Sequence, residues 1–237
     1  MMEAVEKRSE AIKQSAETMK DKFNWLAYDL AIANTSFYFY KKIVDAQRQE
    51  FRLELRKSRE FWGYTKRAHE QTALAYLCRV YDTYRDRRKD RDAFHLLRLV
   101  EEIDESMLSD AEKRQRQADL EFLQKEDATK KRFPDPRVAK LRKWRNNLLS
   151  HSNEEVVLNG LKPFREKNPF APEEIQQLVD QGFSIIERWA LQYEVSFPIK
   201  KLAQERDDYL FVLESLRLAL HRQKEAQKRS VEGGRGQ

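Results

Sequence analysis

The segment Arg145-Asn146-Asn147-Leu148-Leu149-Ser150-His151 places a charged residue on the face of a predicted helix that should turn towards a core. At about 100° per residue, the apolar side chains around it fall on one arc of roughly 140°. They are Val138, Leu141, Trp144, Leu148 and Leu149. Arg145 lies inside this arc, and His151 lies at its edge, about 20° from Trp144. The pattern predicts an amphipathic helix that packs within a bundle and carries two polar side chains on or beside its apolar face.

The arginine and the histidine have both a functional and a structural interpretation. Arg145 cannot lose its charge, so on a core-facing stripe it must either pair with a carboxylate or line a wet cleft where an anion binds. His151 titrates near neutrality and can move a proton beside such an anion. In the structural alternative, Arg145 is an ion-pair partner and His151 caps the last carbonyl groups of its helix.

The spacing of these two residues also bears on assembly. Residues six apart on a helix are separated by about 240° of rotation and about 9 Å of rise, so Arg145 and His151 are not neighbours on one helix surface. A two-fold axis can bring two identical helices together across one cleft. We therefore predict a homodimer with the two motif helices near its axis.

The sequence resembles a known family in two segments. Arg145-Asn146, four intervening residues and His151 resemble the Arg-polar-x(3 to 5)-His signature of the HEPN superfamily, all-helical proteins of which many are metal-independent ribonucleases. Residues 141–153 are similar to the motif helix of the abortive-infection (AbiU-type) branch, and residues 74–82 are similar to that branch's earlier helix, which ends in Tyr-Asp. The resemblance implies a HEPN-like antiparallel helical bundle over residues 25–220.

Carried over by position, the resemblance implies roles for individual residues. Arg145 and His151 would form the catalytic pair, with Asn146 as a polar helper. Asp82, which ends the Tyr-Asp helix, has three interpretations: it pairs with Arg145, it positions His151, or it is a surface helix cap.

Composition supports an all-α fold built from long helices. Charged residues make up 36% of the 237-residue chain and aromatic residues 11%, too many aromatics for a disordered protein. Gly63 is the single glycine among the first 132 residues, and all six prolines lie at position 134 or later. Ser109 and Glu112 predict a capping box, and Pro136 fits the first turn of the motif helix.

The expected elements follow from these signals. Helices are predicted over about residues 3–57 with a break near 34–36, 58–85, 94–103, from 109, from 136 through the motif, 172–196 and 207–227, with a loop over 153–171. In terms of domains, we expect a helical extension at 1–24, the HEPN-like domain at 25–220 and a frayed tail at 221–237.

Positive charge is concentrated before the motif. Between Lys125 and Arg145 the chain has nine basic and three acidic residues, so this window alone accounts for the net charge of +6. Such a field suits a polyanion, and we predict RNA as the partner. The candidate RNA-binding residues are Lys131, Arg132, Lys140, Arg142 and Lys143. Alternatively, Lys130-Lys131-Arg132 is a solvated helix end.

Metal and cofactor sites are not expected. Cys78 is the single cysteine and lies at helical spacing among apolar residues, which favours a buried packing role. The four histidines are scattered, and no glycine-rich phosphate loop occurs. No apolar run is long enough to span a membrane and no signal-peptide core is present, so we expect a cytoplasmic protein without membrane contact.

These observations lead to one functional hypothesis and two rivals. The leading hypothesis is a metal-independent endoribonuclease of the HEPN type in antiphage abortive infection or toxin action, with an antitoxin or another defence protein as a further partner. The first rival is a non-catalytic HEPN module that binds RNA or a nucleotide. The second is a helical partner-binding scaffold in which Arg145 makes a buried ion pair.

Overall fold

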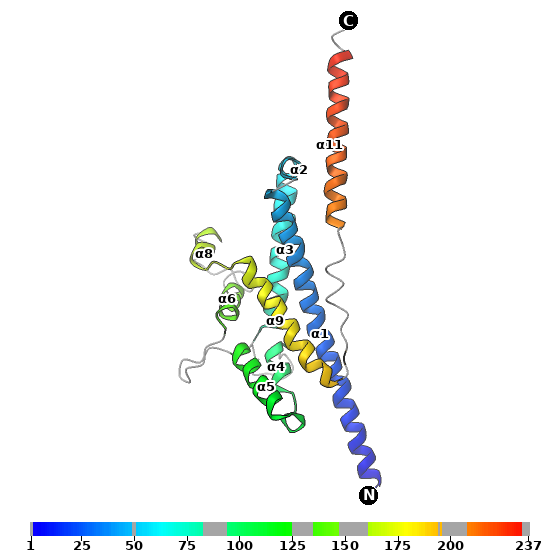
Figure 1. Ribbon diagram of the computed structural model, residues 1–237, viewed down its shortest axis with the longest axis vertical. Helices are drawn as coiled ribbons and strands as arrows, with labels where there is room; N and C mark the ends of the chain where they lie inside the picture. Colours follow the sequence, from blue (N-terminus) through cyan, green and yellow to red (C-terminus); the bar gives the residue numbers. More distant parts are fainter. Residues whose placement is uncertain are drawn as a thin grey trace.

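The structure is a computed structural model that describes residues 2–48, 51–82, 94–124, 135–146, 161–193, 195 and 208–233. All regular elements in these residues are helices, which confirms the predicted all-α class. In chain order they are α1 (Met2–Arg48), α2 (Arg52–Lys57), α3 (Arg59–Val80), α4 (Leu96–Glu101), η2 (Glu105–Met107), α5 (Asp110–Leu123), α6 (Pro136–Trp144), α8 (Leu161–Lys167), α9 (Pro172–Ala190), η5 (Leu191–Tyr193) and α11 (Asp208–Gly233) (Figure 1).

The centre of the molecule is an antiparallel pair of long helices, α1 and α3, joined through the short α2 (Figure 1). Phe23, Leu26 and Leu30 recur at helical spacing on α1 and are fully buried. They share one core with Leu77 of α3 and with Ile186 of α9. Burial of each such side chain contributes about 1.5–3 kcal/mol, so this three-helix contact is the main source of stability.

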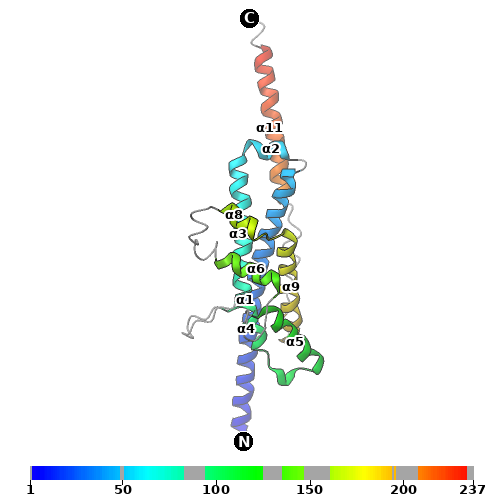
Figure 2. The same cartoon turned by 90° about the vertical axis from the view of Figure 1, so that its left-hand side faces the viewer.

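A second, smaller cluster lies at the other end of the α1–α3 pair. It consists of Ile43, Ala46, Phe51, Leu55, Trp62 and Leu213. Leu213 belongs to α11, which contacts α2 there and extends away from the rest of the molecule (Figure 2). The helix continues to Gly233, beyond the predicted end near Gln227, because neither proline nor glycine interrupts it before that residue. The helix therefore runs into the segment predicted as a frayed tail.

Two local predictions are wrong. The first helix has no break at 34–36; the chain instead leaves α1 after Arg48. Ser36 is buried between the core residues Ala33 and Phe37, so tertiary burial outweighs the local preference of polar side chains for a break. The predicted loop over 153–171 contains α8, whose Arg165 pairs with Glu70 of α3.

Several helix starts were predicted correctly. The Ser109–Glu112 capping box is present at the start of α5, and Pro136 occupies the first turn of α6. Within the described part of the chain, no helix combines the length and the apolar character needed to cross a membrane.

Candidate active site

The motif helix α6 begins at a firmly bonded N-cap. The carboxylate of Asp135 accepts a hydrogen bond of 2.9 Å from the backbone N–H of Arg137, and two more of 2.7 and 2.8 Å from the Arg137 guanidinium. Burial opposes ionisation of Asp135, but these hydrogen bonds lower its pKa below the ordinary value. The charged carboxylate at the positive end of the helix sets where α6 starts.

The predicted apolar face of α6 is buried. Val138, Leu141 and Trp144 all lie in the main core. The indole N–H of Trp144 donates to the carbonyl oxygen of Asn168 at 2.9 Å. This hydrogen bond connects the end of α6 to the segment that follows α8. Leu148 and Leu149, the other two members of the predicted stripe, lie outside the described residues.

Arg145 follows α6 directly and faces the end of α3. Its guanidinium Nη1 forms an ion pair with the carboxylate of Asp82, and its Nε donates to the side-chain oxygen of Asn146 at 3.0 Å. The Arg145 side chain is 22% exposed and the Asp82 side chain 17% exposed. The pair is therefore partly buried, and part of the Arg145 side chain is accessible to solvent.

Asp82 is held in place by its neighbour. The Tyr81 side chain is fully buried and its hydroxyl donates to the carbonyl oxygen of Leu178 on α9 at 2.6 Å. A Cβ at Gly182 would lie 3.1 Å from this hydroxyl and 3.0 Å from Leu30, so a larger residue there would require these side chains to shift. Burial raises the pKa of Tyr81 and keeps its hydroxyl protonated at neutral pH.

The Tyr-Asp helix end and the motif helix thus meet at one ion pair. A family profile described as HEPN_AbiU2 (AbiU2) matches residues 2–212 of the chain. The chain belongs to the AbiU2 family of HEPN proteins. Membership confirms the predicted family, and the match spans both segments that carried the resemblance, residues 74–82 and 141–153. No curated protein and no solved structure matches the chain significantly.

Arg142 joins three elements of this AbiU2 protein. Its Nε, Nη1 and Nη2 atoms donate to the carbonyl oxygens of Tyr81, Gln124 and Leu123, at 3.2, 2.8 and 2.6 Å respectively. These carbonyl groups lie at the carboxyl ends of α3 and α5, where helices carry partial negative charge. Burial, opposed by the charge of Asp82 and assisted by that of Arg145, lowers the pKa of Arg142 to about 10. Arg142 remains charged at neutral pH.

This structural role of Arg142 was missed from the sequence, although a signal for it existed. On the helical wheel Arg142 lies only about 20° beyond the edge of the predicted apolar arc, so its stem must run along the core. Three of its five N–H donors are engaged with backbone carbonyl oxygens. We therefore leave Arg142 out of the RNA-binding proposal below.

The other candidate RNA-binding residues are placed differently. Lys140 pairs with Glu174 at the start of α9, with 2.6 Å between Nζ and Oε1. Lys143 lies on the exposed side of α6. Lys131 and Arg132 lie outside the described residues, as does His151, so the geometry of the arginine–histidine pair stays a prediction.

Cys78 has the packing role that was predicted. Its side chain is buried beneath α6, where the thiol lies 3.8 Å from the carbonyl oxygen of Leu141. Burial raises the pKa of the Cys78 thiol to about 12, so it carries no negative charge at neutral pH. Among the described residues, no three His, Cys, Asp or Glu side chains group together as metal ligands would. Metal independence itself stays a prediction.

Proposed function

We propose that this HEPN protein is a metal-independent endoribonuclease that acts in abortive infection or as a toxin. The observation that best supports the proposal is the partly exposed side chain of Arg145, held by Asp82 and Asn146. An arginine has five N–H donors. The contacts with Asp82 and Asn146 use Nη1 and Nε, and Nη2 makes no hydrogen bond with a described residue. In the proposal, this amino group donates to a phosphate oxygen.

In the proposed reaction, the RNA supplies its own nucleophile. The ribose 2′-oxygen attacks the adjacent phosphorus, and the bond from phosphorus to the 5′-oxygen breaks. His151 takes the proton from the 2′-hydroxyl or delivers one to the leaving 5′-oxygen. Arg145 offsets the charge that develops on the phosphate, an effect for which preorganised donors can supply several kcal/mol. The products would be a 2′,3′-cyclic phosphate and a 5′-hydroxyl.

Asp82 and Asn146 act on Arg145 rather than on the RNA. Asp82 restricts the guanidinium to one orientation, so less rotamer freedom is lost when a phosphate binds. The side-chain oxygen of Asn146 is already used by Arg145, which leaves its amide NH₂ to orient the phosphate or the imidazole of His151.

The basic window would bind the RNA backbone on either side of the scissile bond. Positive charge precedes Arg145 in the sequence. It comes from Lys131, Arg132, Lys140 and Lys143. Contacts of this kind are salt-dependent and carry no sequence information. A homodimer is part of the proposal, because it would place two motif helices across one RNA-binding cleft. A defence-system partner would act on the same assembly.

The Arg145–Asp82 ion pair also favours a second candidate function. An arginine that bridges α6 and the end of α3 stabilises the bundle whether or not RNA is cut. In this alternative the protein is a helical scaffold that binds a defence partner, and Arg145 contributes to stability alone.

A cleavage assay separates the two candidates. Wild-type protein and the His151→Ala variant would be compared on fluorescent single-stranded RNA. His221→Ala is the matched control, because His221 lies exposed on α11, far along the chain from the motif. The endoribonuclease proposal expects cleavage by wild type and by His221→Ala, and none by His151→Ala. Equal cleavage by all three proteins, or none by wild type, would contradict it.

A further inference from the structure

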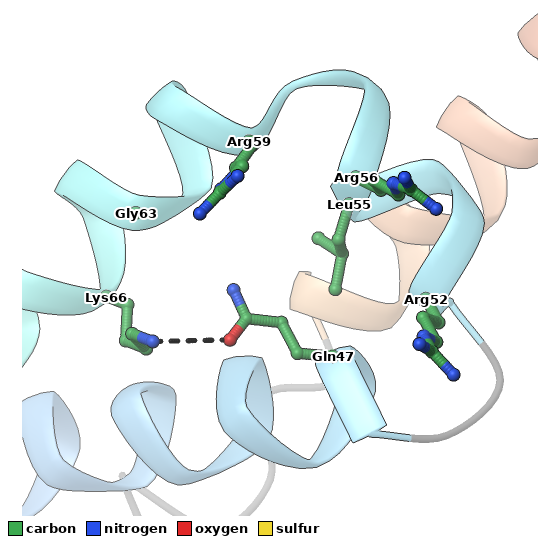
Figure 3. Close-up of a pocket in the computed structure, with 7 residues that line it drawn as sticks. All are labelled: Gln47, Arg52, Leu55, Arg56, Arg59, Gly63 and Lys66. Carbon is green, nitrogen blue, oxygen red and sulfur yellow. Dashed lines mark hydrogen bonds between the residues drawn. The ribbon is translucent and has the colours of Figure 1, made fainter.

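Four basic side chains line a cavity of about 320 Å³ where α1, α2 and α3 meet (Figure 3). Arg52 and Arg56 come from α2, and Arg59 and Lys66 come from α3. The cavity lies at the opposite end of α3 from Asp82. Nineteen residues separate Gly63 in its wall from Asp82, a distance of about 28 Å along the helix. It is therefore distinct from the candidate active site.

The cations in this cavity have no acidic counterpart in its wall. No carboxylate lines it, and none of the four forms an ion pair within the described residues. The one acidic residue of α2, Glu54, faces α11, where its carboxylate lies 3.8 Å from Arg217. Lys66 donates to the side-chain oxygen of Gln47 at 3.3 Å, which leaves the Gln47 amide NH₂ as a further donor.

The sequence spacing places these side chains on two helix faces that border the cavity. Arg52 and Arg56 are four residues apart on one face of α2, and Arg59, Gly63 and Lys66 recur at intervals of four and three on one face of α3. Figure 3 shows Arg59 and Lys66 on the side of the Gln47 amide, whereas the guanidinium groups of Arg52 and Arg56 on α2 point away from it. Like charges at such spacing repel one another. A bound anion would attract each of these cations and so offset their mutual repulsion.

Gly63 is a second, independent sign of a ligand. It lies inside α3, where glycine is less favourable than alanine by roughly 0.5–1 kcal/mol. A Cβ at this position would meet no atom within 4 Å, so packing does not require glycine here. Its effect is to leave the wall between Arg59 and Lys66 bare. A bare wall of this kind would let a ligand approach the helix backbone closely.

We propose that this cavity binds a compact, multiply charged phosphate anion, such as a triphosphate group. Its volume lies near the lower end of the usual range for ligand sites, which begins at about 300 Å³. Arg59, Lys66 and the Gln47 amide, with two further cations on α2 beside them, suit an anion with several charges better than one RNA phosphate, which carries a single charge. No aromatic side chain lines the cavity to stack on a base, so recognition is through the phosphates. The inference is independent of RNA cleavage.

Calorimetric titration of the full-length protein with inorganic tripolyphosphate tests the proposal. We expect Arg59→Ala and Lys66→Ala each to weaken binding about tenfold or more, because each removes a charge-assisted hydrogen bond. Arg67→Ala is the matched control, since Arg67 is exposed on α3 next to Lys66 but does not line the cavity. Absence of binding by wild type, or equal weakening in the control, would overturn the proposal.

A variant that keeps every charge gives a second readout. Gly63→Leu would fill the cavity from its bare wall, and leucine is a better helix former than glycine. We expect it to lose tripolyphosphate binding without loss of thermal stability. Orthophosphate and adenosine triphosphate, titrated in parallel, show whether the charge of the anion or the nucleoside sets the affinity. A short single-stranded RNA that competes as well as tripolyphosphate at equal phosphate concentration would contradict the compact-anion assignment.

Discussion

The guanidinium of Arg145 on the motif helix pairs with the carboxylate of Asp82, which lies 63 residues earlier at the end of α3. The pair connects the two segments that carry the resemblance to the AbiU2 family. It also places one residue in two roles, because the arginine that stabilises the meeting of α6 with α3 is the arginine proposed to bind the scissile phosphate.

The Arg145–Asp82 pair should contribute measurably to stability. Because the pair is partly buried, we expect a coupling energy of about 1–2 kcal/mol, between the values typical of exposed and buried ion pairs. A double-mutant cycle with Arg145→Met, Asp82→Asn and the double variant, followed by urea denaturation, measures it. A coupling energy near zero would mean that Asp82 does not hold Arg145, and would remove the basis for its positioning role.

Replacing Arg142 should lower stability, whereas replacing its neighbour Lys143 should weaken RNA binding. Arg142→Ala leaves the carbonyl oxygens of Tyr81, Leu123 and Gln124 without these donors, so we expect a loss of about 2–4 kcal/mol in the free energy of unfolding. Lys143→Ala removes an exposed side chain and should change stability by less than about 0.5 kcal/mol. It should instead weaken RNA binding and reduce its salt dependence. Equal stability of the two variants would show that the carbonyl contacts contribute little.

The protein should be a homodimer in solution. The six-residue spacing between Arg145 and His151 leaves a single motif poorly closed on itself, so we expect two motifs near a two-fold axis. Light scattering on the purified full-length protein measures the mass directly. A mass of 28.4 kDa, that of one chain, throughout the micromolar range would refute the dimer.

Cleavage should not depend on a divalent metal. The proposed nucleophile is the 2′-hydroxyl of the RNA, activated by His151, so no metal-bound water is required. We expect activity to persist in EDTA, DNA to resist cleavage, and the products to carry a 2′,3′-cyclic phosphate and a 5′-hydroxyl. Activity that EDTA abolishes and magnesium or manganese restores would refute this mechanism.

His69 should make stability depend on pH below neutrality. The imidazole stacks on Phe39 with 5.2 Å between ring centres, and burial lowers its pKa below the ordinary 6.5. The unfolded chain therefore binds a proton at a higher pH than the folded protein does. Folding stability should fall as the pH drops through 6.5 towards the folded-state pKa.

Replacing His69 with phenylalanine, which keeps an aromatic ring against Phe39, should reduce this pH dependence. Urea denaturation at about pH 7.5 and about pH 5.5 brackets the transition of an ordinary histidine. His221→Phe is the control, since His221 is exposed on α11. If His69→Phe loses as much stability between the two pH values as wild type, burial of His69 is not the cause.

Features that depend on neighbouring residues could be predicted from the sequence. Val138, Leu141 and Trp144 face the core because helical periodicity alone directs them to one side. The capping box of Ser109 and Glu112 is likewise decided within one turn of helix. Features in which a local conformational preference competes with burial in the core could not be predicted from the sequence. Ser36 lies within an unbroken helix because the residues around it are packed in the core.

For the candidate site, the sequence by itself determined which residue types α6 presents and on which of its faces they lie. The identity of their partners was decided only by the tertiary structure. Arg145 meets Asp82, and Arg142 meets the carbonyl oxygens of Tyr81, Leu123 and Gln124, because α3, α5 and α6 converge at their carboxyl-terminal ends. Helical periodicity specifies in which direction a side chain points around its own helix axis, but not where that helix crosses another. The crossing of the helices decides which charged groups come within hydrogen-bond distance of one another.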